Sequence, residues 1–267
     1  MPEHASLAGF YDDAYRQTDA EQAATYARWR ALGAEGKADH VIDLCARAGI
    51  APASTLDVGC GDGALLSELH RRGFGGRLAG VEISAAAVAL AAERPGIDSV
   101  ERYDGRRLPA PDGGYDLGIL SHVLEHVSEP ATLLGEVGRA CRAVLVEVPL
   151  EANLSAARPR KRARAAGIGH LQRLDRRRAR ELVAAGGLTV ACELTDPLPA
   201  RVHLFFAATA PARAAALAKW ALRASLHDIA RPLALRLFTV HYACLCLVPG
   251  PSRQSAPGAQ RPGADCY

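Results

Sequence analysis

The chain has 267 residues, of which 49% are apolar, and a formal net charge of +3. This length is enough for one large domain, with or without a cap, that buries a substantial core. So small a charge does not by itself imply a polyanionic partner such as a nucleic acid. The seven cysteines form no C-x-x-C pair, which indicates reduced thiols.

The N-terminal residues give no sign of export or of a membrane anchor. The first four residues do not begin a basic-then-apolar signal sequence. No apolar run reaches the roughly 18 residues that a membrane span needs. We therefore expect a cytoplasmic protein. Residues 1–50 predict cap helices ahead of the core, because apolar residues recur at helical spacing from Ala38 to Ala48 and Gly49 supplies a stop.

The stretch from Leu56 to Leu66, LDVGCGDGALL, predicts a buried strand, a glycine-rich turn and a helix. Glycines let a ligand approach the backbone, and a helix N-terminus offers unpaired N–H groups. The spacing G-x-G-x-G differs from the dinucleotide motif, and no Lys-Ser/Thr pair follows as in a P-loop. The acidic Asp57 and Asp62 repel a pyrophosphate but suit a ligand with an ammonium group, which points to S-adenosylmethionine (SAM).

This stretch resembles motif I of the class I SAM-dependent methyltransferases. Three further segments follow in the order that this family requires. Residues 80–84, GVEIS, resemble its second strand; residues 103–105, YDG, its third-strand end; and residues 115–127, YDLGILSHVLEHV, its fourth strand and following helix. The last segment has the form seen in small-molecule members of the type-11-like group, such as quinone-biosynthesis methyltransferases. The resemblance covers roughly residues 50–195.

The resemblance implies cofactor-binding roles for residues at the strand ends. Glu82 would accept hydrogen bonds from both ribose hydroxyls, and Asp104 would accept one from the adenine amino group. Asp57 would order the N–H groups of the glycine loop. Taken singly, each could instead be an ordinary carboxylate in a turn. The complete set of cofactor-binding candidates is Asp57, Gly59, Cys60, Gly61, Gly63, Glu82, Ile83, Asp104, Gly105, Ser121 and His122.

Regular alternation of strands and helices continues beyond the glycine motif. We expect strands at 77–82, 97–103, 115–121 and 142–148, and helices at 63–72, 84–94 and 129–140. This pattern predicts an α/β fold, a Rossmann-like doubly wound sheet with helices on both faces. Following the family, it has seven strands, mostly parallel with the last antiparallel. Ligands bind beyond the carboxyl ends of such strands, where Asp57, Glu82, Asp104 and Ser121 fall.

Two aromatic residues near the N-terminus and two polar residues of the core are candidates for binding the acceptor. In similar enzymes the leading helices cover the SAM pocket and form a wall of the acceptor site. Tyr11 and Tyr15 either close over SAM or the acceptor or simply staple a cap helix to the core. His126 either lines the methyl-transfer side or packs at a helix start, and Glu147 ends the fifth strand, which normally faces the acceptor.

The string from His122 to His126 spells H-x-x-E-H, an inverted zinc-protease signature. That interpretation needs a long helix and a third ligand downstream. Here the motif follows a buried strand directly, and Pro130 prevents a long helix. The methyltransferase resemblance also explains the whole string without a metal, so no metal is expected.

Arginines concentrate between residues 158 and 180 and flank His170. The segment is either a solvated surface, a mobile basic lid over an acidic or phosphorylated acceptor, or a nucleic-acid-binding surface that lacks the interleaved aromatic residues of single-strand binders. Related enzymes often carry a histidine facing the acceptor at the position of His170. Its unperturbed pKa near 6.5 would let it take the acceptor's proton, so it is the candidate catalytic residue, although it could equally cap a loop.

The C-terminal part departs from the family pattern. A strand at 188–194 completes the predicted core, 51–195, but the last strand, 239–248, comes only after about 40 further residues. We interpret residues 196–238 as a helical insertion that forms an acceptor cap or a dimer contact. Residues 249–267 are rich in Pro, Gly, Ser and Gln and predict a disordered tail.

The sequence therefore predicts a SAM-dependent methyltransferase that produces S-adenosyl-L-homocysteine and methylates an O or N atom of a small molecule, such as a natural-product or sugar intermediate. Proximity and orientation for in-line displacement would supply most of the catalysis. One alternative is a non-catalytic SAM-fold protein that docks a partner through residues 158–180. A second alternative is a nucleic-acid (RNA) methyltransferase, although the missing Asn-Pro-Pro-Tyr-type motif after the fourth strand argues against an amino-group DNA methylase. An aminopropyl-transferase-like enzyme is disfavoured, since the acidic residues that such enzymes use after the fourth strand are missing. The acceptor and a homodimer stay open.

Overall fold

The computed structural model describes residues 4–16 and 19–249, with side chains from residue 8 onward. Its centre is one seven-stranded sheet in the order β3-β2-β1-β4-β5-β7-β6. Neighbouring strands are parallel except that β7 runs antiparallel to β5 and β6. The predicted doubly wound fold is confirmed. The strands are β1 (Ser54–Val58), β2 (Arg77–Glu82), β3 (Ser99–Arg102), β4 (Tyr115–Ser121), β5 (Cys141–Pro149), β6 (Thr189–Asp196) and β7 (His241–Leu247).

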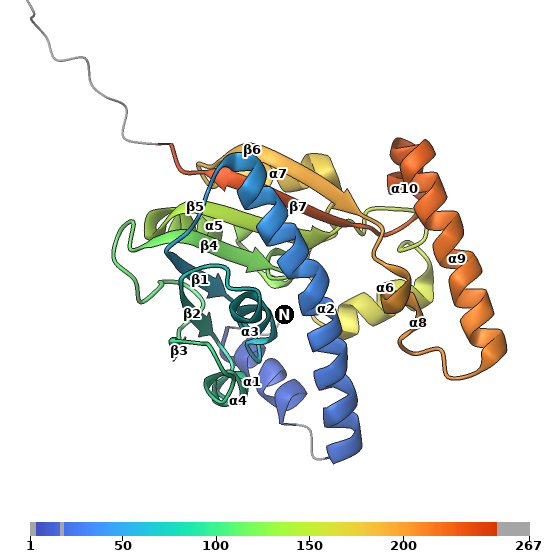
Figure 1. Cartoon of the computed structure of the whole chain (residues 1–267), viewed down its shortest axis with the longest axis horizontal. Coiled ribbons are helices and arrows are strands. Elements are labelled where there is room, and N and C mark those ends of the chain that lie inside the picture. Colours follow the sequence, from blue (N-terminus) through green and yellow to red (C-terminus); the bar gives the residue numbers. More distant parts are fainter. Residues whose placement is uncertain (1–3, 17–18, 250–267) are drawn as a thin grey trace, which may run out of the picture.

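Helices cover both faces of the sheet and extend beyond one end of it (Figure 1). Those of the N-terminal half are α1 (His4–Tyr15), α2 (Ala20–Ala48), α3 (Ala64–Arg71), α4 (Ala85–Ala92) and α5 (Pro130–Ala140). Those of the C-terminal half are α6 (Pro159–Gly167), α7 (Arg176–Ala185), α8 (Ala200–Leu204), α9 (Ala210–Ile229) and α10 (Arg231–Leu237). No helix among the residues described is long and apolar enough to cross a membrane.

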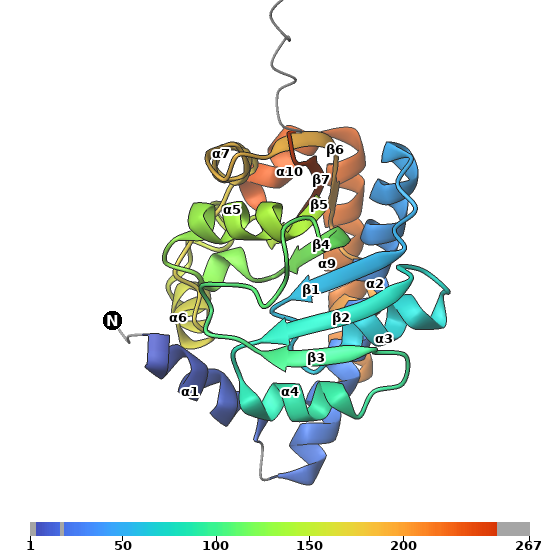
Figure 2. The ribbon, with the colours of Figure 1, turned by 90° about the vertical axis from the view of Figure 1, so that its left-hand side faces the viewer.

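The sheet separates two apolar cores. On one face, residues of α2 and α3, such as Val41 and Leu66, pack against alternate positions of the central strands. On the other face, α5 and α7 supply residues such as Leu134 and Leu182. Figure 2 shows the sheet from its β3 edge, with helices to either side of it. Because side chains of a strand alternate between faces, each strand contributes to both cores.

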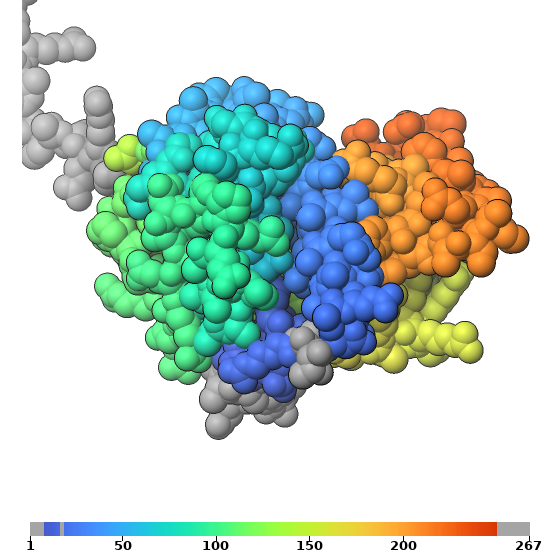
Figure 3. All heavy atoms as spheres, turned by 60° about the horizontal axis from the view of Figure 1, so that its bottom comes forward, coloured from blue at the N-terminus to red at the C-terminus, as the bar shows by residue number. Residues whose placement is uncertain are grey.

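The long helix α2 joins the core to the inserted helices. Its N-cap Asp19 accepts hydrogen bonds from the N–H groups of Glu21 and Gln22, and Gly49 ends it in the left-handed conformation. α2 packs against α3, β6 and β7, and its Trp29 ring lies 5.2 Å from that of Phe205. Figure 3 shows α2, in blue, between the core and the orange inserted helices.

The insertion before the last strand is helical, as predicted. It comprises α8, α9 and α10, and Pro232 lies in the first turn of α10, where its missing N–H costs nothing. α9 packs against both α8 and α10. The predicted tail from residue 249 lies, except for that first residue, outside the described residues.

One local prediction is wrong. The resemblance suggested a helix directly after the fourth strand, but Leu124–His126 form only a single 3-10 turn. Regular helix resumes at α5, where Pro130 occupies the first turn. A proline disfavours helical conformation in the residue before it, which explains the interruption.

Candidate functional site

A cavity of about 1330 Å³ opens at the carboxyl ends of the central strands, beneath α1 and α2. The site residues predicted from the sequence come together there with one exception, Gly63. The predicted residues that line the cavity are Tyr11, Tyr15, Asp57, Gly59, Cys60, Gly61, Glu82, Ile83, Asp104, Gly105, Ser121, His122, His126, Glu147 and His170.

The glycine loop after β1 takes a conformation that other residues rarely adopt. Gly59 and Gly61 have φ of 76° and 55°. A Cβ on Gly59 would lie 2.7 Å from Val123 Cγ2, and one on Gly61 would lie 2.5 Å from Tyr15 Oη. The chain therefore keeps this backbone bare at the floor of the cavity, which is the fit that a closely approaching SAM requires.

Glu82, at the end of β2, holds the loop in place. Its carboxylate accepts hydrogen bonds from the N–H groups of Gly61 at 3.0 Å and Ile83 at 2.7 Å. Burial raises the pKa of Glu82, and these hydrogen bonds oppose that rise. The sequence assigned the ordering of the loop to Asp57, but the Gly61 amide donates to Glu82 instead. Asp57 lies buried beside the loop, where burial raises its pKa to about 7.

Two further predictions about the cofactor end change in detail. Gly63 begins α3, and a Cβ there would lie 2.6 Å from Ile97 Cδ1 and 3.1 Å from Ala91, so it serves helix packing and not the cavity. Asp62 was expected to suit an ammonium group. Its carboxylate instead receives hydrogen bonds from Arg30 at 2.8 Å and Arg94 at 2.6 Å, which neutralise it.

The adenine-side candidates lie together in the turn after β3. Asp104 Oδ1 accepts hydrogen bonds from the N–H groups of Arg106 and Arg107 at 2.8 and 2.9 Å. These bonds lower the pKa of Asp104 and shape the turn, in which Gly105 has φ of 77°. The carboxylate and the glycine both line the cavity next to Tyr103.

Helix α1 closes the cavity from the N-terminal side. Asp12 fastens it to the start of α4, because its Oδ1 accepts hydrogen bonds from Ser84 Oγ at 2.6 Å and from the Ala86 N–H at 3.1 Å. Tyr15 then reaches the glycine loop, while the ring of Tyr11 meets that of His126 edge-on at 5.7 Å. The sequence analysis did not identify Asp12, because no motif surrounds this aspartate and nothing in the sequence near it indicates a buried partner.

The opposite end of the cavity is polar because several strands change character at their ends. Positions 143 and 145 of β5 and 243 and 245 of β7 are apolar and buried against α2. Two residues further along the same face come Glu147 and His241. His40 of α2 and Asp196 at the end of β6 adjoin them, with His40 Nε2 3.1 Å from Asp196 Oδ2.

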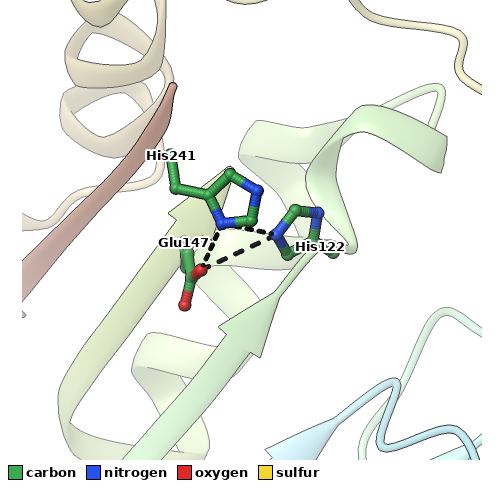
Figure 4. A group of neighbouring side chains, drawn as sticks. All are labelled: His122, Glu147 and His241. Carbon is green, nitrogen blue, oxygen red and sulfur yellow. Dashed lines mark hydrogen bonds and ion pairs between the residues drawn. The ribbon is translucent and has the colours of Figure 1, made fainter. Parts of the chain in front are cut away.

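Three imidazoles surround one oxygen of Glu147, and Figure 4 shows two of them, those of His122 and His241. Oε1 lies 2.9 Å from His241 Nδ1, 3.4 Å from His40 Nδ1 and 3.6 Å from His122 Nε2. Burial alone would raise the pKa of Glu147, but the three imidazoles hold it well below its usual range. Burial lowers the pKa of His40, and Asp196 and Glu147 outweigh it, raising that pKa to about 10.

The sequence analysis missed His40 and His241. Their signal is a polar residue at a position where the period of the element calls for an apolar one. This signal can be recognised only when the strand pairing is known. Pro149 and His241 are paired across β5 and β7, although they lie 92 positions apart in the sequence, 241 − 149.

A second polar group lies next to the first. The rings of His126 and His170 meet edge-on at 4.7 Å, and His170 Nδ1 lies 2.7 Å from Glu151 Oε2. Burial lowers the pKa of His126, and the charge of Glu125 opposes this. Glu125 is 1% exposed, and neither of its carboxylate oxygens makes a hydrogen bond with the residues described. His122 and His126 belong to different groups, so the residues of H-x-x-E-H do not surround one point.

The strand order, the bare glycine loop and the buried acidic residue ending β2 define a class I SAM-dependent methyltransferase fold. The comparison with protein families agrees. The family model of the methyltransferase domain matches residues 26–193, more than half of the chain. The chain belongs to this SAM-dependent methyltransferase family.

Curated relatives match the chain only in part. An uncharacterized protein in transposon Tn4556 of Streptomyces fradiae is 37% identical over 94 residues, which are 33% of this chain and 27% of that protein. The ubiquinone biosynthesis O-methyltransferase of Acinetobacter baumannii is 28% identical over 103 residues, 36% of this chain and 41% of the relative. The chain thus spans less than half the length of these relatives.

Solved structures share the fold. The geranyl diphosphate C-methyltransferase of Streptomyces coelicolor, in a complex that includes S-adenosyl-L-homocysteine, has a TM-score of 0.58 at 15% identity and covers 80% of this chain and 76% of its own. Phosphoethanolamine N-methyltransferase 2 of Haemonchus contortus, in complex with SAM, has a TM-score of 0.52 at 14% identity and covers 74% and 49%.

Proposed function

We propose that the protein transfers a methyl group from SAM to an oxygen or nitrogen atom of a small-molecule acceptor, with a hydroxyl oxygen preferred. The observation that supports this most directly is the single cavity, which is lined at one end by the glycine loop and Glu82 and at the other by His126, His170 and His241. Its volume of about 1330 Å³ exceeds that of usual sites for one drug-sized ligand, about 300–1,000 Å³, so a cofactor and an acceptor fit together.

The cofactor end matches the parts of SAM by chemistry. SAM supplies a methyl group that its sulfonium sulfur makes electrophilic. Glu82 offers a buried carboxylate for a ribose diol, Asp104 and Gly105 offer the turn that faces adenine, and Asp57 offers a negative charge for the ammonium of the methionine part. Holding both reactants in line beneath α1 would supply most of the rate and exclude water.

The acceptor end supplies candidate proton acceptors. His170 is oriented by Glu151, which lies 2.7 Å from its Nδ1, as a base is oriented by a third group in catalytic triads. Burial keeps His126, whose ring meets that of His170, in its neutral form. Several imidazoles at one end of a cavity favour a hydroxyl acceptor, because a hydroxyl must lose a proton on methylation, whereas a neutral amine needs less help.

The acceptor class rests on analogy and on the surroundings of the cavity. The curated relative from Acinetobacter baumannii is a ubiquinone biosynthesis O-methyltransferase, which acts on a small molecule. Helix α6 carries exposed Arg160, Arg162 and Arg164 and leads into Ile168, which lines the cavity. A basic helix beside the opening favours an acceptor with an acidic or phosphorylated group.

The other arginines of residues 158–180 do not favour a nucleic-acid surface. On α7, Arg176 and Arg180 both pair with Glu193, and Arg177 pairs with Glu181 at 2.7 Å. Two carboxylates thus offset half of the positive charge of the four arginines on α7. We therefore do not propose an RNA acceptor or a docking function.

Calorimetric titration with SAM and S-adenosylhomocysteine tests the cofactor half of the proposal. We expect micromolar binding to the wild type, and at least about a tenfold loss in Glu82→Gln, because that substitution removes a charged acceptor worth about 1.5–3 kcal/mol. Glu101→Gln, an exposed carboxylate on β3, is the matched control and should bind like the wild type. Absence of SAM and S-adenosylhomocysteine binding to the wild-type protein would refute the proposal.

Turnover is tested separately with isotope-labelled SAM and a panel of hydroxylated, aminated and phosphorylated metabolites, with mass spectrometry of the products. Methylation of a hydroxyl compound is the expected result. Binding of SAM without methylation of any class, under conditions in which S-adenosylhomocysteine is removed, would support the non-catalytic alternative.

A further inference from the structure

Three side-chain atoms that can bind a metal converge beside the cavity. Each comes from near the end of a different strand. His122 follows β4, Glu147 lies two residues before the end of β5, and His241 begins β7. His122 Nε2 lies 3.3 Å from His241 Nδ1 and 3.6 Å from Glu147 Oε1, and His241 Nδ1 lies 2.9 Å from that oxygen. Figure 4 shows the two rings and the carboxylate pointing toward one another.

These separations match the edges of a coordination tetrahedron. Zinc binds histidine nitrogen and carboxylate oxygen at about 2.0–2.2 Å, so two ligand atoms around it lie about 3.4 Å apart. The three observed distances, 2.9, 3.3 and 3.6 Å, lie on both sides of that value. One cation would therefore reach all three donors after shifts of a few tenths of an ångström.

The surroundings of His122 fix the ring in the orientation that a ligand needs. Its other nitrogen, Nδ1, lies 3.1 Å from Oε1 of Glu125, which is 1% exposed. The negative charge of this carboxylate favours a proton on Nδ1 and leaves the Nε2 lone pair free for a metal, although the two side chains do not form a hydrogen bond as they stand. Glu125 is the only carboxylate on the 3-10 turn that follows His122.

The backbone of His122 is also strained. Its φ is 60°, in the left-handed region that residues with a side chain seldom occupy. Its N–H donates to the carbonyl oxygen of Glu147 at 2.9 Å, which ties the strained residue to β5. Strain of this kind concentrates at functional sites. Here it turns the imidazole toward Glu147 and His241.

Groups behind Glu147 hold its carboxylate as well. Ser121 Oγ donates to Oε2 at 3.4 Å. His40, whose side chain is 8% exposed, points Nδ1 at Oε1 from 3.4 Å, and Asp196 holds its other nitrogen. That Nδ1 has no hydrogen-bond partner among the residues described. A buried nitrogen without a partner, aimed at the cluster, indicates that the polar centre is incomplete as the side chains stand.

We propose that His122, Glu147 and His241 bind one divalent transition-metal ion of the zinc type. Two imidazoles and one carboxylate form a common ligand set of catalytic zinc, which leaves a fourth position open. All three residues line the cavity, so that position faces the space assigned to the acceptor. The role of the ion in turnover rests on the proposed function: an acceptor hydroxyl bound there would lose its proton more readily. The binding of the ion does not rest on it.

This site differs from the sequence expectation of no metal and from the zinc-protease interpretation of H-x-x-E-H. Only His122 of that motif is a ligand, and Glu125 supports it from behind. Glu147 and His241 come from elsewhere in the chain. The neighbouring group of Glu125, His126 and His170 is a competing location, so the experiment must separate the two.

The test uses the tag-free full chain, stripped with a chelator and titrated with Zn²⁺ by calorimetry and with Co²⁺ by visible absorption. We expect one ion per chain and the intense absorption of four- or five-coordinate Co²⁺. His241→Gln should weaken binding at least about tenfold. His122→Gln should do the same, which keeps the test valid should either variant fold poorly.

Two control variants keep their affinity if the assignment is right. His70→Gln alters an exposed histidine on α3, and His170→Gln alters the neighbouring group. Absence of binding to the wild type would overturn the proposal, as would loss of binding in His170→Gln with retention in His241→Gln. A network of hydrogen-bonded imidazoles without a metal predicts the first of these results.

S-adenosylhomocysteine affinity is measured on every variant in the same buffer. Unchanged affinity in His241→Gln shows that the chain is folded, and it separates failure of the metal site from failure of the proposed function.

Discussion

Two carboxylates are buried at the same edge of the sheet, and their surroundings shift their pKa values in opposite directions. Asp57, at the cofactor end, has a pKa raised to about 7 by burial, with Lys37 only partly opposing it. Glu147, at the acceptor end, has a pKa far below its usual range, because three imidazoles outweigh the effect of burial. Both side chains are 3% exposed or less.

The difference indicates what each half of the cavity is prepared to receive. The cofactor end holds a carboxyl group that needs a cation to ionise fully, and in the proposed function the ammonium of SAM would provide one. The acceptor end has already assembled three imidazoles around Glu147, so a metal ion there would replace protons on His122 and His241. The first half is completed by its ligand, whereas the second is built from the chain itself.

The largest effect expected from this comparison concerns Asp57. Its carboxyl binds a proton more tightly in the folded than in the unfolded chain, so folding stability decreases as pH rises from about 4 to about 7. Asp57→Asn cannot ionise and escapes this loss. Its free energy of unfolding should equal that of the wild type near pH 4 and exceed it by about 4 kcal/mol above pH 7, since one pKa unit is about 1.4 kcal/mol.

Urea unfolding of both proteins without ligand, at pH 5 and pH 8, measures this difference. If the difference in unfolding free energy between the two proteins is the same at both pH values, the idea that burial destabilises the charged form of Asp57 is contradicted. Asp116→Asn provides a contrast. Asp116 accepts hydrogen bonds from Ser54 and Arg142, so the variant should be less stable than the wild type at pH 8.

The second effect concerns the loop itself. In Gly59→Ala the new Cβ would meet Val123 at 2.7 Å in a backbone with φ of 76°, so the loop must move. We expect about a 100-fold loss of S-adenosylhomocysteine affinity, corresponding to about 3 kcal/mol. Calorimetry measures it.

Gly113→Ala is the control for this variant. Gly113 also has a positive φ, 59°, but no atom lies within 4 Å of the added Cβ and the residue is not among those lining the cavity. It should cost stability of about 1 kcal/mol and leave affinity unchanged. Equal affinity losses in both variants would show that general destabilisation, and not the bare loop, explains the result.

A third effect, on the rate of methylation and not on stability or affinity, is expected from the acceptor end. His170→Gln should bind S-adenosylhomocysteine within about twofold of the wild type, yet slow methylation of a hydroxyl acceptor by about 100-fold or more, as the removal of a general base does. Quenched-flow or steady-state assays with the acceptor found by screening measure the rate. If His170→Gln loses as much S-adenosylhomocysteine affinity as Gly59→Ala, the division of the cavity into a cofactor end and an acceptor end is contradicted.

The cofactor half was accessible from the sequence because its parts are local. The strand, the glycine turn and the helix between Leu56 and Leu66 are contiguous, Glu82 ends β2, and Asp104 lies in the turn after β3. The rule that ligands bind at the carboxyl ends of parallel strands then places them together. Errors remained only where neighbours in space decide a role: Gly63 packs against Ala91, and Asp62 pairs with Arg30 and Arg94.

The acceptor half was only partly accessible. His126, Glu147 and His170 were identified from their places relative to strands, but His40 and His241 were not, because no local pattern marks either one. His241 meets Glu147 only because β7 runs antiparallel beside β5, and His40 meets it only because α2 packs on that face. The alternation of polar and apolar residues along one strand does not reveal which element packs against each face of the sheet.

The sequence by itself determined the strand–helix alternation, the glycine loop and hence the SAM-binding fold, since these depend on backbone conformation and on residues close together in the chain. Only the tertiary structure decided which charges are neutralised, which are left unsupported, and that His122, Glu147 and His241 converge. The physical reason is that pKa values and metal-binding geometry depend on distances of a few ångströms between residues up to 156 positions apart, and the packing of strands and helices sets those distances.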